Sequence, residues 1–190
     1  MRKKDDEKQE RIKQAVMHLI LEQGLTGTSI SKIAREAGVS PATVYVYYEN
    51  KDEMLRDIYT EYSEEIFGYM TEQTRPEMDA RSLVRTLMES YYYYIRDHRE
   101  VYSFVEQFSH CPALACQCSG RHDMCSIFSL IDQMKAQGKI RSCSNEALEA
   151  VMFFPIKAVA LHGRSDTGSA ARQLEEIIEL VQYALIPDDQ

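Results

Sequence analysis

Thiol and imidazole groups, the side chains best suited to metal or redox chemistry, crowd into one short stretch of the chain. Four of the five cysteines lie between Cys111 and Cys125, and two histidines accompany them. Such ligands can bind a soft metal such as zinc or copper(I), although the spacing matches no pair of CxxC knuckles. Oxidation or electrophile capture at Cys116 or Cys118 is a second hypothesis. Cysteine also serves as a small hydrophobic residue, which is the interpretation we favour here.

A second concentration of polar side chains lies at residues 41–48, which read PATVYVYY. Val44 is the main residue that a core would bury there, and most of the others are small or carry a hydroxyl group. Small residues let a helix backbone approach the DNA major groove, and hydroxyl groups can reach phosphates and base edges. The methyl group of Thr43 can in addition touch a thymine methyl. These residues therefore predict a recognition helix.

The residues on either side predict the elements that would position this helix. Ser29 is placed to cap a helix whose apolar residues recur at the 3, 4 and 7 spacing of one face. Gly38 can adopt the left-handed conformation that ends this helix, while Ser40 and Pro41 suit the cap and first position of the next one. A further helix starts near Lys51, whose amine could clamp a phosphate. The pattern is that of a helix-turn-helix.

The stretch from Thr28 to Leu55 is similar to the DNA-binding domain of the TetR/AcrR family of bacterial one-component regulators. The shared pattern is T-S-I-S-K-I-A-x-x-A-G-V-S, then T-V-Y-x-Y-Y, then N-K-D-E-M-L, and it covers roughly the first third of the chain. The resemblance implies a phosphate contact from Lys51. It also implies DNA contacts from Ser29, Ser31, Lys32, Pro41, Ala42, Thr43, Tyr45 and Tyr47.

The chain departs from the family pattern at three positions. The family often has arginine at Ser31, histidine at Tyr47 and phenylalanine at Tyr48, so the operator of a relative does not carry over. A helix-turn-helix can also be a packing motif in which Tyr45 or Tyr47 is half-buried. We favour DNA binding, because the caps, the turn glycine and the proline agree in one register.

Length and composition limit the class of protein. The chain has 190 residues, of which 44% are hydrophobic, enough for one ordinary core and a small satellite domain. No apolar run approaches the roughly 20 residues that span a bilayer, and the charged N-terminus is unlike a signal peptide. We therefore expect a cytoplasmic protein with reduced cysteines and no membrane partner.

The negative charge of the chain is unevenly distributed. Residues 1–60 hold 10 Lys or Arg and 10 Asp or Glu, a net charge of 0, whereas residues 61–190 hold 12 and 20, a net charge of −8. The acidic excess thus lies outside the predicted DNA-binding unit. Because that unit is not basic, its DNA affinity must come from a few placed cations, helix N-termini and dimeric avidity.

Apolar periodicity predicts an all-α fold of about nine helices. We expect an N-terminal three-helix helix-turn-helix domain at residues 1–50, followed by a helical effector-binding and dimerisation domain at residues 51–190. Pro155 should kink or locally unwind the helix that contains it. Apart from the two short helices of the helix-turn-helix, the expected helices span residues 6–23, 51–74, 78–97, 99–109, 124–138, 145–162 and 169–185, and Pro155 lies in the helix at 145–162.

The C-terminal domain contains candidate residues for an effector pocket. The run Tyr91–Tyr94 spreads over every face of a helix, so at least one pair must face inward, and a polar aromatic or cationic ligand could satisfy the buried hydroxyls. A tyrosine-rich seam between helices is the alternative. The candidate pocket residues are Tyr62, Tyr91, Tyr94, Phe104, Phe108, Met124, Phe128 and Phe154.

These observations favour one function over two others. We expect a homodimeric transcriptional repressor that leaves a palindromic double-stranded DNA operator when a small-molecule effector binds. In the resembling family the last two helices, here about 145–162 and 169–185, form the dimer interface. The alternative trigger is metal or thiol oxidation through the Cys111–Cys125 cluster. An enzyme is not expected, because no Ser-His-Asp order, glycine-rich phosphate cradle or HExxH motif is present. We also expect no cofactor.

Overall fold

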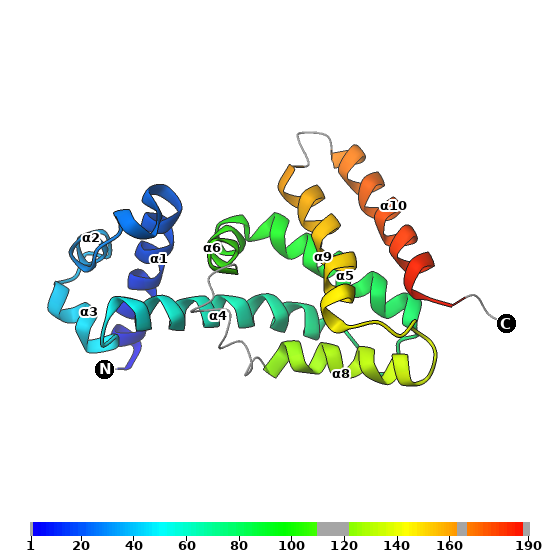
Figure 1. Ribbon diagram of the computed structural model, residues 1–190. Helices are drawn as coiled ribbons and strands as arrows, with labels where there is room; N and C mark the ends of the chain where they lie inside the picture. Colours follow the sequence, from blue (N-terminus) through cyan, green and yellow to red (C-terminus); the bar gives the residue numbers. More distant parts are fainter. Residues whose placement is uncertain (1, 110–121, 163–166, 188–190) are drawn as a thin grey trace. The chain divides into compact units, whose positions relative to one another are not determined.

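The computed structural model describes residues 2–109, 122–162 and 167–187 (Figure 1). Those residues form nine helices and no strand, which confirms the all-α prediction. The helices are α1 (Arg2–Gly27), α2 (Ile30–Glu36), α3 (Pro41–Tyr47), α4 (Lys51–Glu72), α5 (Ala80–Asp97), α6 (Arg99–Ser109), α8 (His122–Ala136), α9 (Asn145–His162) and α10 (Thr167–Leu185).

The chain divides into two compact units. Of the described residues, unit 1 holds 2–63 and 100–109, and unit 2 holds 64–99, 122–162 and 167–187. Helix α4 therefore begins in unit 1 and ends in unit 2. The expected functional division at residue 50 concerns which part binds DNA and which part binds an effector, and it stays a prediction.

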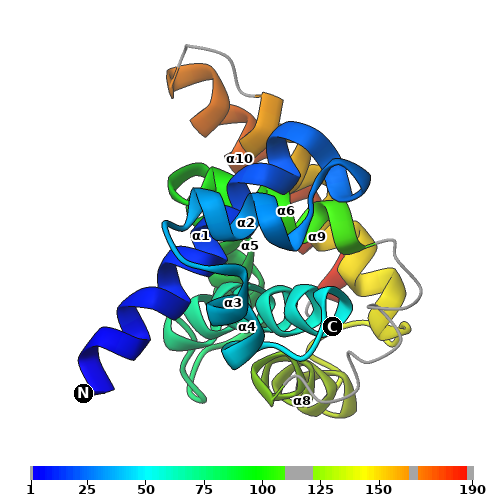
Figure 2. The same cartoon turned by 90° about the vertical axis from the view of Figure 1, so that its left-hand side faces the viewer.

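Unit 1 is built on one apolar core that α1, α2, α3 and α4 share. Ile12 from α1, Ile33 from α2, Val44 from α3 and Ile58 from α4 all have no exposed surface. Burying a side chain of this size stabilises the fold by roughly 1.5–3 kcal/mol relative to leaving it in water. Figures 1 and 2 both show α2 and α3 side by side, with α3 against the first turns of α4. The short helices α2 and α3 are therefore held by the two longer ones.

Helix α1 extends further than its apolar stripe predicts. The expected helix spans 6–23 and ends at Gly24, whereas α1 runs from Arg2 to Gly27. Gly24 nevertheless has a non-helical conformation, with φ 70° and ψ 176°, so that it breaks the helix at the expected residue. A single turn follows the break before α2 begins.

Unit 2 contains a three-helix packing of α5, α9 and α10. Arg85 on α5 binds Glu175 on α10 through two N–O contacts of 2.7 and 2.5 Å. One turn away, Arg81 and the buried Gln182 exchange two hydrogen bonds of 3.2 and 2.8 Å. Helix α9 continues through Pro155 without local unwinding. None of the helices among the described residues is long and apolar enough to cross a membrane.

Candidate nucleic-acid interface

The turn between α2 and α3 has the geometry that the sequence predicts. Ser29 caps α2 by accepting a hydrogen bond from the backbone N–H of Lys32 at 3.4 Å, and Ser40 caps α3 by accepting one from Thr43 at 3.1 Å. Gly38 adopts φ 65°. A Cβ at Gly38 would lie 3.5 Å from its nearest neighbour, which is ordinary contact, so the backbone conformation and not the available space favours glycine.

Helix α3 has one buried face and one open face. Val44 is fully buried and Tyr48, the residue after the helix, is 4% exposed. On the opposite side Tyr45 is 55% exposed and Val46 is 78% exposed. Pro41 and Ala42 in the first turn are also exposed. The helix therefore presents apolar and aromatic surface that the core of unit 1 does not use.

The remaining polar candidates differ in how far they are available. The Ser31 side chain is exposed at the start of α2. The Thr43 hydroxyl lies 2.8 Å from the Ser40 hydroxyl, so this hydrogen bond already occupies part of its capacity. Tyr47 is half-buried and packs against the core of unit 1. Of the tyrosines predicted to contact DNA, Tyr45 is the more accessible.

Both lysines predicted to contact DNA bind oxygens of residues 23–28, at the C-terminal end of α1. The Lys51 ammonium donates to the carbonyl oxygens of Leu25 and Thr28 at 2.8 and 2.5 Å. The Lys32 ammonium donates to the Gly27 carbonyl and the Gln23 side chain, both at 2.7 Å. The two cations thus bind oxygens at the C-terminal end of α1 and at Thr28 just beyond it, which ties the starts of α2 and α4 to α1.

The start of α4 is fixed by reciprocal capping. The Asn50 side chain accepts a hydrogen bond from the Glu53 backbone N–H at 2.9 Å, and the Glu53 carboxylate accepts one from the Glu49 N–H at 2.9 Å. This arrangement satisfies two N–H groups at the N-terminal end of the helix. It also fixes the chain immediately after α3.

A partly exposed ion pair lies near Tyr48, the residue that follows α3. Lys13 on α1 pairs with Glu61 on α4 and lies 3.5 Å from Glu10. Desolvation acts to lower the pKa of Lys13, but the hydrogen bond to Glu61 and the nearby acidic charges outweigh it and raise the pKa. Burial raises the pKa of the Tyr48 phenol at the end of α3. Lys13 therefore stays charged and links α1 to α4.

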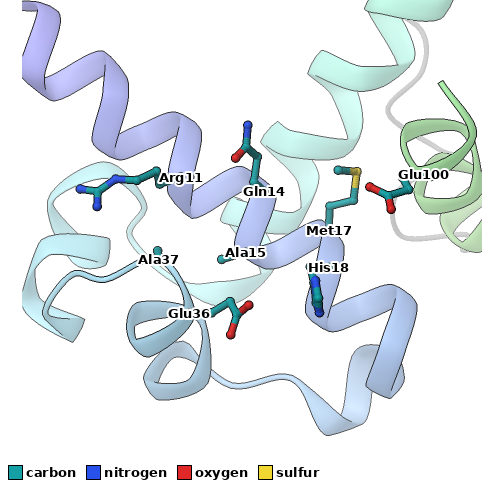
Figure 3. Close-up of a pocket in the computed structure, with 8 residues that line it drawn as sticks. All are labelled: Arg11, Gln14, Ala15, Met17, His18, Glu36, Ala37 and Glu100. Carbon is teal, nitrogen blue, oxygen red and sulfur yellow. The ribbon is translucent and has the colours of Figure 1, made fainter. Parts of the chain in front are cut away.

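A surface groove of about 410 Å³ lies in unit 1 between α1, the end of α2 and the start of α6. In Figure 3 Arg11 and Gln14 point away from Glu36, while Glu100 points toward Met17. The polar groups do not converge on one point, and both signs of charge are present. The groove contains none of the residues predicted to bind DNA or an effector.

Three of the predicted effector residues lie in the core of unit 1. Tyr62 and Phe104 meet edge to face with ring centroids 5.8 Å apart, and Phe104 lies 5.0 Å from Phe108. All three side chains are buried and belong to the same apolar cluster as Val44. These aromatic rings pack on one another in the core that supports α3.

The other described candidates lie in unit 2. Tyr94 is 2% exposed, donates a hydrogen bond to Glu65 at 2.9 Å and stacks on His98 at 4.6 Å. Tyr91 packs on Phe153 at 4.9 Å. Both tyrosines of α5 thus contact side chains of neighbouring helices, Glu65 on α4 and Phe153 on α9.

Two phenylalanines in unit 2 are more accessible than the tyrosines. Phe128 lines an open groove of about 620 Å³ together with α8 residues such as Ser129 and Asp132. Phe154 is 58% exposed on α9, with the Lys157 ammonium 5.5 Å from its ring centroid. The side chain of Met124 lies outside the described residues. The eight predicted pocket residues thus divide between the two units and the part that is not described.

The cysteine cluster from Cys111 to Cys125 also lies outside the described residues and side chains. Cys143, the remaining cysteine, is a half-buried free thiol. Within the described part of the chain no three His, Cys, Asp or Glu side chains come together in a way that could hold a metal ion.

Sequence reasoning missed Val46, the most exposed of the large hydrophobic side chains described. Its position follows from helix geometry, because residues turn by about 100° each and Val46 lies about 200° round the axis from the buried Val44. The sequence pattern of residues 41–48 predicts DNA contacts from hydroxyl groups, and Val46 has none. The burial of Val44 and Tyr48 on one side of α3 indicates that Val46, on the opposite side, is exposed.

Comparison with known proteins gives the N-terminal region a family. Residues 12–58 match the model of bacterial regulatory proteins of the tetR family. The chain is 25% identical over 116 residues to an HTH-type transcriptional regulator of Haemophilus influenzae, covering 59% of this chain and 60% of that protein. It is 27% identical over 78 residues to the fatty acid metabolism regulator protein of Bacillus subtilis, covering 41% and 40%. The matches therefore span about half the length of these curated relatives.

Solved structures extend the likeness to the whole fold. A TetR family transcription regulator from Marinobacter aquaeolei VT8 is 25% identical and superposes with a TM-score of 0.85 over 99% of this chain and 100% of that one. A TetR-family regulator from Haemophilus influenzae Rd, 21% identical, has the same fold, with a TM-score of 0.77 over 95% and 99%. Together with the match at residues 12–58, these likenesses confirm the resemblance seen in the sequence: the N-terminal region matches the tetR family of bacterial regulatory proteins, and the chain has the fold of a TetR family transcription regulator.

Proposed function

We propose that the protein is a homodimeric transcriptional repressor that binds a palindromic DNA operator through α2 and α3. Residues 1–50 form its DNA-binding domain, and residues 51–190 bind a small-molecule effector and form the dimer. The observation that carries this proposal is the open face of α3, where Tyr45 is 55% exposed on a helix that is capped at its start and anchored by Val44. It acts in the cytoplasm, where the operator is.

Phosphate contacts come from the groups around α3. The exposed Ser31 hydroxyl on α2 and the exposed first turn of α3 approach the phosphate backbone of the DNA. The Lys32 and Lys51 ammonium groups each have three N–H donors, two of which bind carbonyl or amide oxygens, and the third can reach a phosphate. Phosphate contacts of this kind fix the register of the protein on the duplex without reading its sequence.

The dimer forms through α9 and α10. Four large apolar side chains are exposed there: Val151 at 42%, Phe154 at 58%, Leu180 at 69% and Tyr183 at 74%. In each helix the two residues are three positions apart, so that they lie on one face. Apolar surface of this extent on two packed helices favours a protein partner, and a second copy would bury it symmetrically.

The dimer sets the spacing of the two recognition helices. A palindromic operator requires them about one turn of DNA apart, or a multiple of it. An effector that binds one arrangement of the C-terminal helices better than the other would shift this spacing, by no more than its differential affinity allows. The trigger proposed is a small molecule, since no comparison supports a metal or thiol trigger. No enzymatic step is part of the proposal.

The test compares two tyrosines of similar exposure. Tyr45→Ala should weaken binding to a duplex selected from random DNA by about 10-fold or more, since one base or phosphate contact is worth roughly 1–3 kcal/mol and each dimer has two. Tyr93→Ala, which removes a 40% exposed tyrosine from α5, is the matched control and should retain wild-type affinity. Full affinity in a folded Tyr45→Ala dimer would remove α3 from the interface.

A further inference from the structure

The open face of α3 is apolar to an extent that limits how it can read DNA. Ala42 and Val46 are four residues apart, so they lie one above the other on the same face of the helix, and both are exposed. Val46 has 78% of its surface exposed, whereas Val44, the other valine of α3, is fully buried. Thr43 precedes Val46 by three positions, so it lies next to Val46 on the helix surface. The face therefore offers methyl groups where many recognition helices offer amides or cations.

The side chains that make bidentate contacts to bases are missing from α3. Bidentate recognition of guanine uses arginine or lysine, and that of adenine uses asparagine or glutamine. The seven residues of α3, PATVYVY, contain none of these. The Thr43 hydroxyl is hydrogen-bonded to Ser40, and the flanking lysines, Lys32 on α2 and Lys51 on α4, bind carbonyl oxygens at the end of α1.

The major groove has one apolar group that such a face can recognise, the 5-methyl group of thymine. We propose that α3 reads its half-site chiefly through contacts between Val46 and thymine methyl groups, with Ala42 and Thr43 extending the apolar surface. Thymines, rather than guanines, then set the sequence preference at the positions beneath α3. This inference rests on the proposed function and specifies which feature of the operator the protein recognises.

The magnitude of the effect follows from the area buried. Removing one methyl group from an apolar contact costs about 0.8 kcal/mol, which corresponds to about fourfold in affinity for each contacted thymine. A base pair keeps all its hydrogen bonds when deoxyuridine replaces thymidine, so the replacement removes only the methyl group. It therefore isolates methyl recognition from every polar contact.

The experiment is a double-mutant cycle between the protein and a selected operator. Wild-type protein and Val46→Ala are titrated with duplexes in which single thymines, in both half-sites, are replaced by deoxyuridine. At one or more thymines the replacement should lower the affinity of the wild type about fourfold per half-site. The same replacement should hardly change the affinity of Val46→Ala, which already lacks the apolar contact. Because Val46 is mostly exposed, Val46→Ala should fold normally. Leu25→Ala, which truncates another exposed apolar side chain of unit 1, should behave as wild type.

Different outcomes separate this inference from the proposed function. If sequence-specific binding persists but no deoxyuridine replacement changes it, methyl recognition is wrong while the regulator stands. Retention of the full deoxyuridine effect by Val46→Ala would likewise exclude Val46 as the reader. If folded dimer selects no sequence at all, both proposals fail, and the apolar face of α3 would instead be a contact for another protein.

Discussion

Two surfaces of this molecule expose large apolar side chains, and they are constructed differently. Helix α3 has only seven residues, and its open face combines Tyr45 and Val46 with the small first turn of the helix. Helices α9 and α10 have 18 and 19 residues and expose apolar side chains along two packed faces. The short surface suits insertion into a groove, whereas the long pair suits the flat self-complementary contact of a dimer.

The supports behind the two surfaces also differ. On either side of α3, Lys32 of α2 and Lys51 of α4 bind backbone oxygens of residues 25–28, at the end of α1. Behind α10 an arginine and a carboxylate, Arg85 and Glu175, bind each other. The first surface is thus held through the backbone of one turn, and the second through side chains that join two helices. The following changes separate these contributions.

The largest effect should come from the long surface. Leu180→Glu places a charge at a 69% exposed position of α10 and should convert the dimer to monomer, because a buried unpaired charge opposes association. Operator affinity should fall by about 100-fold or more through lost avidity. Sedimentation and operator titration measure the two effects. Gln137→Glu adds the same charge outside α9 and α10, and equal losses in that variant would contradict the assignment.

The two valines of α3 should divide stability from recognition. Val44→Ala should lower the free energy of unfolding by about 2 kcal/mol, because it removes two buried methyl groups and leaves a cavity. Val46→Ala should change that free energy by less than about 0.5 kcal/mol, since its side chain is mostly in water. Denaturant unfolding of both variants checks the difference. Equal effects on stability would mean that α3 has no open face.

The lysine contacts should give a smaller effect. Lys51→Ala removes the donor to the Leu25 and Thr28 carbonyls and should lower stability by about 1 kcal/mol, because charged hydrogen bonds near the surface are partly screened. Thermal unfolding measures this loss, and operator titration measures the accompanying loss of affinity. Unchanged stability with weakened operator binding would assign Lys51 to the phosphate alone and not to the turn.

The smallest effect concerns pH and the support of α10. The hydrogen bond from Arg85 holds the pKa of Glu175 below its ordinary value of 4.5. The pair therefore contributes stability above that value and loses it as pH falls through the lowered pKa in the folded state. The melting temperature of Glu175→Gln should lie slightly below that of wild type at pH 7, and the difference should vanish in acid. A difference independent of pH would point to packing.

The local structure was predictable from the sequence because its signals are local. Capping serines, Gly38 and the 3.6-residue apolar period predicted α2, α3 and the turn between them. The sequence also predicted both ends of α9, at residues 145 and 162. Contacts between distant residues were not predictable in this way. The Lys51 ammonium meets carbonyls more than twenty positions away, and nothing in its neighbourhood distinguishes that role from a phosphate clamp.

The candidate effector residues show the same limit. Apolar periodicity identifies Tyr62, Phe104 and Phe108 as inward-facing, but it does not say which helices they meet. The structure places these three in the core that supports α3, and it places Tyr91 and Tyr94 among the helices of unit 2. A stripe of aromatic residues predicts burial and does not by itself predict a cavity.

The most direct test of the central claim is selection of bound duplexes from a random DNA pool by the purified dimer. We expect a palindrome whose half-sites lie about one turn of DNA apart, or a multiple of it, with two chains bound to each duplex. Thymines should recur at the positions beneath α3. Failure of the folded dimer to enrich any sequence would contradict it, and α2 and α3 would then serve as packing elements.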